Sequence, residues 1–91
     1  MNTMRLRIAT PLTIAADEPD VVSLRAEDAT GGFGLLPGHA AFMTSLAICV
    51  LRWRRADGSQ CFCAVRHGLL RAPDGHEVEV ATREAVLGDT L

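Results

Sequence analysis

Short segments of alternating apolar and polar residues, separated by turn signals, are the feature that most constrains what this chain can fold into. In the first such segment Met4, Leu6 and Ile8 lie on one side of an extended chain. The intervening Arg5 and Arg7 lie on the other side. The same alternation returns at intervals along the sequence. About eight to ten short strands at this spacing predict an all-β sandwich or barrel.

Glycine, proline and aspartate mark the breaks between the expected strands. These breaks are Pro11 and residues 17–20, 29–32, 37–38, 56–59 and 73–75. The run from residue 42 to residue 55 is long enough for a helix, but the alternation of Arg52 and Arg54 with apolar neighbours favours a strand. From Arg83 onward the alternation weakens, and residues 83–87 are expected to begin a helix.

The chain has 91 residues, which is the length of one domain. We expect residues 1–82 to form the β domain and residues 83–91 to begin a truncated helical segment. This expectation rests on the end of the chain, because Leu91 follows without a helix cap or a closing apolar partner.

Composition excludes several functional classes. The net charge is −2 and all nine basic residues are arginine, so no strong positive field argues for nucleic acid or an anionic membrane. No run of about 18 apolar residues is present, and the first residues lead into an alternating strand instead of an apolar signal segment. These features predict a cytoplasmic domain. Three cysteines, an odd number, favour reduced thiols over a disulfide framework.

Residues 31–40 carry the densest set of turn residues in the chain. Four glycines and Pro37 surround a short apolar run, and His39 follows directly. A phosphate-binding loop would need a strand, a glycine loop and a helix N-terminus, usually with a lysine. The chain has no lysine, and Pro37-Gly38 follows the other glycines closely. Glycines that serve turns are the better interpretation.

His39 admits three interpretations. A catalytic histidine needs a nucleophile or a carboxylate within hydrogen-bond reach, and Thr44 and Ser45 are close in sequence. They do not form a nucleophile-elbow pattern, however. The favoured interpretation is that His39 braces the turn, and contact with a partner comes second.

Two further candidate sites have ordinary structural explanations. Cys61 and Cys63 face the same side of a predicted strand and could bind zinc together with His67 or His76. Structural zinc sites usually use another cysteine spacing, so small apolar core packing is favoured, and we predict no metal and no cofactor. We leave the role of Cys49 and of this cysteine pair open.

Residues 52–55 interleave Trp53 with arginines. Such a composition can stack single-stranded nucleic acid. One aromatic residue in a net-acidic chain is weak evidence for nucleic-acid binding, and Trp53 is expected in the core. A small β-barrel module that binds single-stranded nucleic acid through Arg52, Trp53 and Arg71 is kept as the alternative function.

Residues 31–40, followed by residues 42–46, resemble the signature of the epsilon subunit of bacterial F-type ATP synthases. Further similarity lies at residues 4–11, 50–53, 63–70 and 78–86. The chain departs from the family pattern at Ile48-Cys49, where Pro-Gly is usual, and at His67, which replaces a glycine. Gly32 replaces an acidic residue that faces the ring of c subunits. The ending at residues 81–89 is most similar to the sodium-type branch.

The resemblance implies a flattened ten-stranded β-sandwich of two five-stranded sheets, without the C-terminal helical hairpin of the family. It implies a non-catalytic rotor subunit that couples the gamma subunit to the c ring of a proton- or sodium-translocating enzyme. The protein would be peripheral on the cytoplasmic face of the bacterial inner membrane, without membrane insertion, nucleic acid or a small-molecule substrate. The implied partner-binding residues are Gly32, Phe33, Pro37, Gly38, His39, Ala40 and Phe42.

Overall fold

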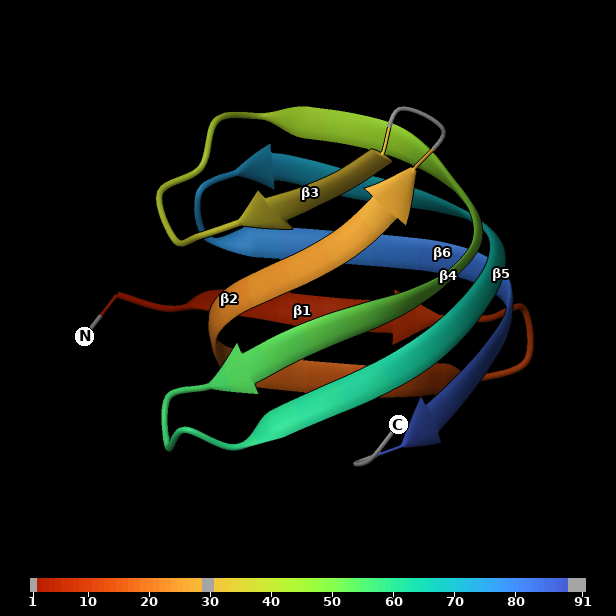
Figure 1. The fold of residues 1–91 in the computed structure, drawn as a ribbon, viewed down its shortest axis with the longest axis horizontal. Coiled ribbons are helices and arrows are strands. Elements are labelled where there is room, and N and C mark those ends of the chain that lie inside the picture. The colour runs from red at the N-terminus through yellow and green to blue at the C-terminus, as the bar shows by residue number, and fades with distance from the viewer. Residues whose placement is uncertain (1, 29–30, 89–91) are drawn as a thin grey trace.

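The computed structural model describes residues 2–28 and 31–88, and the elements in that part of the chain are all strands (Figure 1). The all-β prediction is confirmed. The strands are β1 (Met4–Ala9), β2 (Ile14–Asp28), β3 (Gly31–Leu35), β4 (Phe42–Arg55), β5 (Gln60–Asp74) and β6 (Glu77–Gly88).

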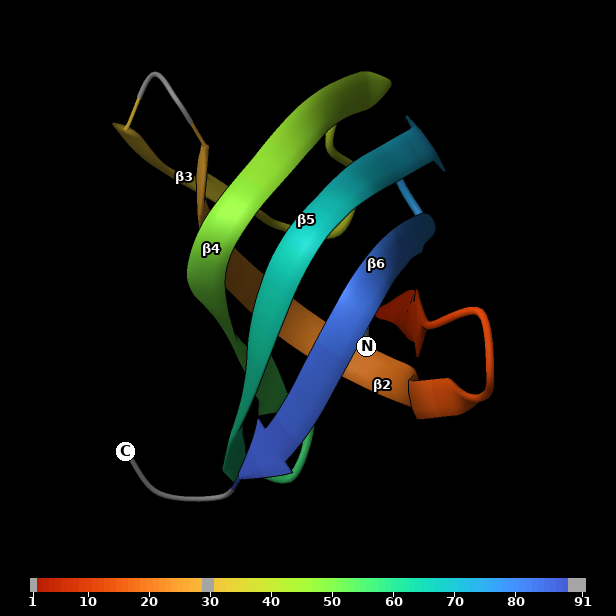
Figure 2. The same cartoon turned by 90° about the vertical axis from the view of Figure 1, so that its right-hand side faces the viewer.

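The strands form one sheet that closes on itself. Their order is β1-β6-β5-β4-β2-β3, and β1 also pairs with β2. The pairs are antiparallel except β1–β6, which is parallel. Five strands therefore form a closed ring, and β3 is attached to the outside of β2. In Figure 2 β4, β5 and β6 run side by side as a curved layer, and β2 crosses behind it.

The expectation of ten strands in two five-stranded sheets is not confirmed, because the described residues form six strands. Residues 17–20, expected to be a turn, lie inside β2. On one side of Pro19 the strand pairs with β1, where Glu18 lies opposite Leu6. On the other side it pairs with β4, where Leu24 lies opposite Trp53. The strand bends instead of ending because each half keeps a hydrogen-bonded partner.

The helix expected from Arg83 is also not observed as far as Gly88. Residues 83–88 continue β6, with Ala85 opposite Val65 and Val86 opposite Ala64 of β5. Pairing with β5 satisfies the backbone groups that a helix would otherwise have bonded internally. Residues 89–91 lie outside the described part of the chain.

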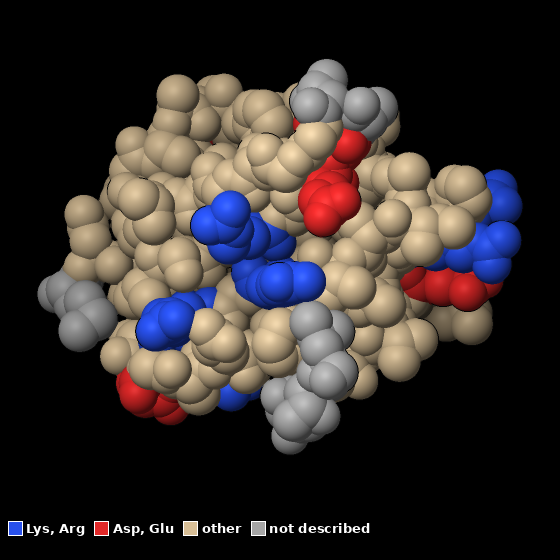
Figure 3. Space-filling model, in the orientation of Figure 1, with Lys and Arg blue, Asp and Glu red and all other residues tan. Residues whose placement is uncertain are grey.

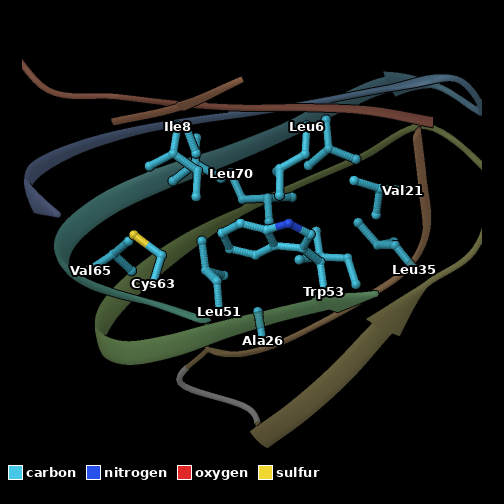
Figure 4. Close-up of a cluster of buried hydrophobic side chains, with 14 of the residues drawn as sticks. Leu6, Ile8, Val21, Ala26, Leu35, Leu51, Trp53, Cys63, Val65 and Leu70 are labelled. Atoms are coloured by element: carbon cyan, nitrogen blue, oxygen red, sulfur yellow. The ribbon is translucent and has the colours of Figure 1, made fainter. Parts of the chain in front are cut away.

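The core fills the inside of the ring (Figure 4). Met4, Leu6 and Ile8 are buried, as their alternation predicts, and Trp53 is only 2% exposed. Each large side chain buried in this way contributes about 1.5–3 kcal/mol to folding. The cysteines at 49, 61 and 63 are all buried and form no disulfide, which agrees with the interpretation of Cys61 and Cys63 as packing residues. Burial raises the pKa of the Cys63 thiol, so the thiol stays protonated.

The break predicted at residues 56–59 is a hairpin turn between β4 and β5, with Asp57 and Gly58 at its tip. Gly58 has a φ of 90°, a conformation that glycine adopts without strain. The Arg55 amide donates to the Ser59 carbonyl over 2.9 Å, and the Gly58 amide donates to the Arg55 carbonyl over 2.9 Å. The Asp57 carboxylate accepts a hydrogen bond from the Ser59 amide. Local sequence alone is therefore sufficient to specify this turn.

β5 continues through residues 66–68, although the backbone there departs from the usual strand conformation. His67 has a φ of 54° and is the non-glycine residue with positive φ in the described chain. A Cβ atom on Gly68 would come within 2.9 Å of the Ala81 carbonyl oxygen. Thr82, which is buried, accepts a hydrogen bond from the Arg66 amide and donates one to the Arg66 carbonyl. This segment is therefore bonded to β6 and does not interrupt the sheet.

The left-handed conformation of His67 predicts a specific response to substitution. We expect His67→Val to lower the free energy of unfolding by about 1–2 kcal/mol, because a β-branched residue is strained at this φ. His67→Gly should leave stability unchanged or slightly raised, since relief of strain offsets the entropy cost of glycine. Urea unfolding of both variants tests this. Equal destabilisation by the two substitutions would show that the imidazole, and not the backbone, matters.

Candidate partner-binding surface

The residues predicted to bind a partner occupy β3, the loop after it and the start of β4. In Figure 1 β3 runs leftward, so the loop and the start of β4 lie at the left end, whereas the start of β3 lies away from it. This end lies opposite the loop between β1 and β2. The predicted residues are Gly32 and Phe33 on β3, Pro37, Gly38, His39 and Ala40 in the loop, and Phe42 at the start of β4.

Two aromatic side chains connect β3 to β4, which are not neighbours in the sheet. The Phe33 and Phe42 ring centroids lie 5.2 Å apart with the ring planes tilted by 58°. Such a contact is worth about 1 kcal/mol beyond area burial. In the loop Leu36 is 63% exposed, and Met43, which points to the opposite face of β4 from Phe42, is 59% exposed. Exposed apolar side chains of this kind occur at protein-binding surfaces.

The loop is held against the turn between β5 and β6. Gly38 has a φ of 85°, and its amide donates to the Gly75 carbonyl over 2.8 Å. The His39 amide donates to the Leu36 carbonyl over 3.1 Å. A Cβ atom on Gly75 would come within 2.6 Å of the Gly38 Cα, so the two backbones touch directly. A loop tied down in this way presents its side chains in a fixed arrangement.

The side chain of His39 makes a local hydrogen bond. Its Nδ1 lies 3.0 Å from the Ala40 carbonyl oxygen, whereas Nε2 is buried and has no hydrogen-bond partner among the described residues. The Thr44 hydroxyl donates to Asp28 over 2.8 Å. Within the described chain the ring therefore has neither the nucleophile nor the carboxylate partner that a catalytic histidine uses.

The described part of the chain does not assemble the residues that the other candidate sites, for a metal ion and for nucleic acid, would need. Its histidine, cysteine and acidic side chains form no group of three that could hold a metal ion. Trp53 is buried and cannot stack a base, and Arg71 pairs with Glu79 over 3.3 Å. Within the described residues no helix has the length and apolarity needed to span a bilayer.

Sequence reasoning missed an ion pair beside the core. The Arg55 guanidinium donates to Glu18 from Nε over 2.5 Å and from Nη2 over 2.9 Å. The hydrogen bond from Arg55 lowers the pKa of Glu18, and partial burial opposes the shift. The buried Trp53 indole lowers this pKa further, although its Nε1 lacks a hydrogen bond of standard geometry. The pair joins the bend of β2 to the end of β4. The sequence does not indicate this contact, because the two residues lie far apart along the chain.

A second feature missed is a groove that brings together Arg25, Arg52 and Arg54. The alternation of Arg52 and Arg54 around Trp53 indicated that both face solvent. The position of Arg25 beside them depends on the pairing of β2 with β4.

Taken together, the strands of the described residues define an all-β domain built on a closed ring, with a tied-down loop at one end. A family model described as "ATP synthase, Delta/Epsilon chain, beta-sandwich domain" matches residues 3–88. The chain belongs to this family, and the resemblance seen in the sequence is confirmed.

Bacterial relatives agree with this membership. The chain is 51% identical over 89 residues to ATP synthase epsilon chain 2 of Paraburkholderia xenovorans, covering 98% of this chain and 64% of the relative. It is 52% identical over 89 residues to ATP synthase epsilon chain 2 of Cereibacter sphaeroides, covering 98% and 61% respectively. The chain therefore spans less than two thirds of these relatives.

Solved structures share the fold. A chain in the Euglena gracilis mitochondrial ATP synthase structure of OSCP, F1 and c-ring matches with a TM-score of 0.87 at 20% identity, covering 96% of this chain and 54% of that one. A chain in the central stalk and c-ring structure of the Tetrahymena thermophila mitochondrial ATP synthase matches with a TM-score of 0.76 at 13% identity, covering 94% and 69%.

The contact between Gly75 and Gly38 generates one prediction. Gly75→Ala should lower the free energy of unfolding by about 2 kcal/mol, because the added methyl group must displace the backbone of the loop. Gly34→Ala is the matched control, since its Cβ would lie an ordinary 3.6 Å from the Leu24 carbonyl oxygen. Urea unfolding of both variants gives the comparison. The close approach would be unimportant if Gly75→Ala were as stable as the control.

The ion pair between Glu18 and Arg55 generates a second prediction, on the pH dependence of stability. At about pH 7 Glu18→Gln should be about 1 kcal/mol less stable than wild type, with Arg55 partly solvated. Because the pKa of Glu18 is lowered in the folded state, its contribution is complete above the usual value of 4.5 and disappears as the pH falls through the lowered pKa.

Urea unfolding of wild type and Glu18→Gln at about pH 7 and at about pH 3.5 measures how far the stability difference between them shrinks at the lower pH. A stability difference that stays the same at both pH values would assign the effect to packing and not to the carboxylate charge.

Proposed function

We propose that this chain is the β domain of a non-catalytic central-stalk subunit of an F-type ATP synthase, where it couples the gamma subunit to the c ring. The observation that carries the proposal is the identity of 51% and 52% with bacterial epsilon chains, together with the family match over residues 3–88. The fold likeness to chains in c-ring assemblies supports it.

The mechanical task fits a closed ring of strands. A coupling element must pass force between partners without deforming. Here β2 pairs on one side with β1 and on the other with β4, so the two sides of the molecule share a backbone. A core packed to the density of a protein interior has low compressibility and transmits strain. The function would be mechanical, with no substrate, cofactor or metal of its own.

The partner surface would be the apolar end formed by β3 and the loop after it. Its exposed Leu36 and Met43 and the Phe33–Phe42 contact supply apolar area, and the Gly38–Gly75 hydrogen bond keeps the loop in place. The residues proposed to touch gamma or the c ring are Gly32, Phe33, Pro37, Gly38, His39, Ala40 and Phe42.

Gly32 removes one contact that the family resemblance implied. Where an acidic residue is usual, Gly32 offers no charge and leaves open space on β3, with the nearest atoms of Ala26 and Glu27 about 4 Å from a built Cβ. Any contact with the c ring here would rest on backbone and on Phe33. The proposed site of action is the cytoplasmic face of the bacterial inner membrane, with peripheral attachment through these partners.

Single-stranded nucleic acid binding is not favoured as an alternative. It depended on Trp53, which lies in the core, and on Arg71, which is paired with Glu79. Only the exposed Arg52 remains of that proposed stacking surface.

His39 provides the test. His39→Ala should weaken binding to a gamma subunit while the melting temperature changes little, because the hydrogen bond that the imidazole makes is local, to the carbonyl of the adjacent Ala40. Co-purification and titration with purified gamma subunit measure the affinity. Leu12→Ala is the control, since Leu12 is 95% exposed in the loop between β1 and β2 at the opposite end of the molecule.

Two results would count against the proposal. If wild type does not bind gamma at all, the assignment to the central stalk fails. If His39→Ala lowers the melting temperature by many degrees and binds gamma as well as wild type, His39 braces the loop and does not face a partner.

A further inference from the structure

Three arginines share the outer face of β2 and β4. Arg25 lies directly opposite Arg52 in the register of these strands, and Arg54 lies opposite Ser23. The residues between them, Leu24 and Trp53, point into the core, so the three guanidinium groups project outward. Figure 3 shows basic side chains gathered near the centre of the face on which β2 and β4 lie in front.

This arrangement opposes stability in the free chain. Like charges directly opposite each other on antiparallel strands are destabilising. Among residues 2–28 and 31–88 none of the three arginines forms an ion pair, whereas Arg5, Arg55 and Arg71 all do. Glu27, two residues beyond Arg25 on the same side of β2, also makes no such pair with them. Three exposed arginines placed together in this way form a surface whose charge suits an anionic group from another molecule.

The arginines border a groove rather than a flat surface. The groove has a volume of about 620 Å³ and runs from β3 across β2 and β4 to β5. Gly34 lies opposite Arg25 and brings no side chain, which keeps the β3 side open. Leu36, 63% exposed, and the half-buried Phe62 supply apolar walls at its two sides. The lining therefore combines positive charge with separate apolar contacts.

We propose that this groove binds an extended, acidic segment of a partner protein, with two or more carboxylates on the arginines and an apolar side chain against Leu36 or Phe62. Guanidinium groups bind carboxylates through paired hydrogen bonds. The proposal stands independently of the assignment to the central stalk, since it needs only the charge and shape of this face.

Two other classes of anion fit less well. A small-molecule site usually encloses its ligand with a few buried polar groups, but Arg25, Arg52, Arg54 and Gln60 are all exposed. Single-stranded nucleic acid needs aromatic faces for its bases, and Trp53 is enclosed in the core below the groove. A peptide uses charge and apolar contact along an open groove, which is what this face offers.

The test uses the 91-residue chain and a labelled peptide of about twelve residues that repeats Gly-Glu-Leu-Glu. A peptide with glutamine in place of glutamate is the neutral control. Fluorescence anisotropy gives the dissociation constants. The triple variant Arg25→Gln, Arg52→Gln, Arg54→Gln should bind the acidic peptide about tenfold more weakly than wild type, as expected for three exposed ion pairs.

A matched variant separates the groove from general charge. Arg5→Gln, Arg66→Gln, Arg71→Gln removes the same charge from positions outside the groove and should bind the acidic peptide as wild type does. Arg25→Gln alone should not lower the melting temperature, because it removes a like-charge pair.

Several outcomes would overturn the proposal. They are no binding of the acidic peptide by wild type, equal weakening in the two triple variants, and equal binding of the neutral peptide. Tighter binding of oligothymidylate or inorganic tripolyphosphate than of the peptide, lost in the groove variant, would assign the site to phosphate groups instead. A melting temperature several degrees lower for Arg25→Gln would show that the arginines stabilise the fold.

Discussion

The double pairing of β2 is the constraint on which the rest of the structure depends. Its first half bonds to β1 and its second half to β4, and this closes β1, β6, β5, β4 and β2 into a ring. Closure gives β1, which would otherwise be an edge strand, a partner on each side, β6 and β2. It also surrounds Trp53 and Leu51 with side chains from every strand of the ring, so the core and the closure support each other.

Closure also arranges the outer surfaces. The loop after β3 meets the turn between β5 and β6 through Gly38 and Gly75, although they are far apart in sequence. The apolar end that we propose as a partner surface therefore belongs to the rigid body and is not a loose extension. The arginine groove lies on the outer face of β2 and β4, where the same pairing that closes the ring sets Arg25 beside Arg52.

Particular residues show how far sequence reasoning reaches. The alternation at Met4, Leu6 and Ile8 predicted a half-buried strand correctly, because a period of two is a property of the extended backbone. The hairpin at Asp57-Gly58 was predictable because its turn needs only local chemistry. The proposed partner segment was visible as a group of turn residues, but its attachment through Gly75 was not.

The misses share a physical cause. The turn expected around Pro19 and the helix expected after Arg83 are strand because distant partners accept their hydrogen bonds, and local propensity cannot report those partners. The sequence by itself determined the all-β class, the faces of the strands, the Asp-Gly turn and the family, since these follow from local pattern and motif. Only the tertiary structure decided the number of strands, the Glu18–Arg55 pair and the meeting of three arginines, because each depends on which strands lie side by side.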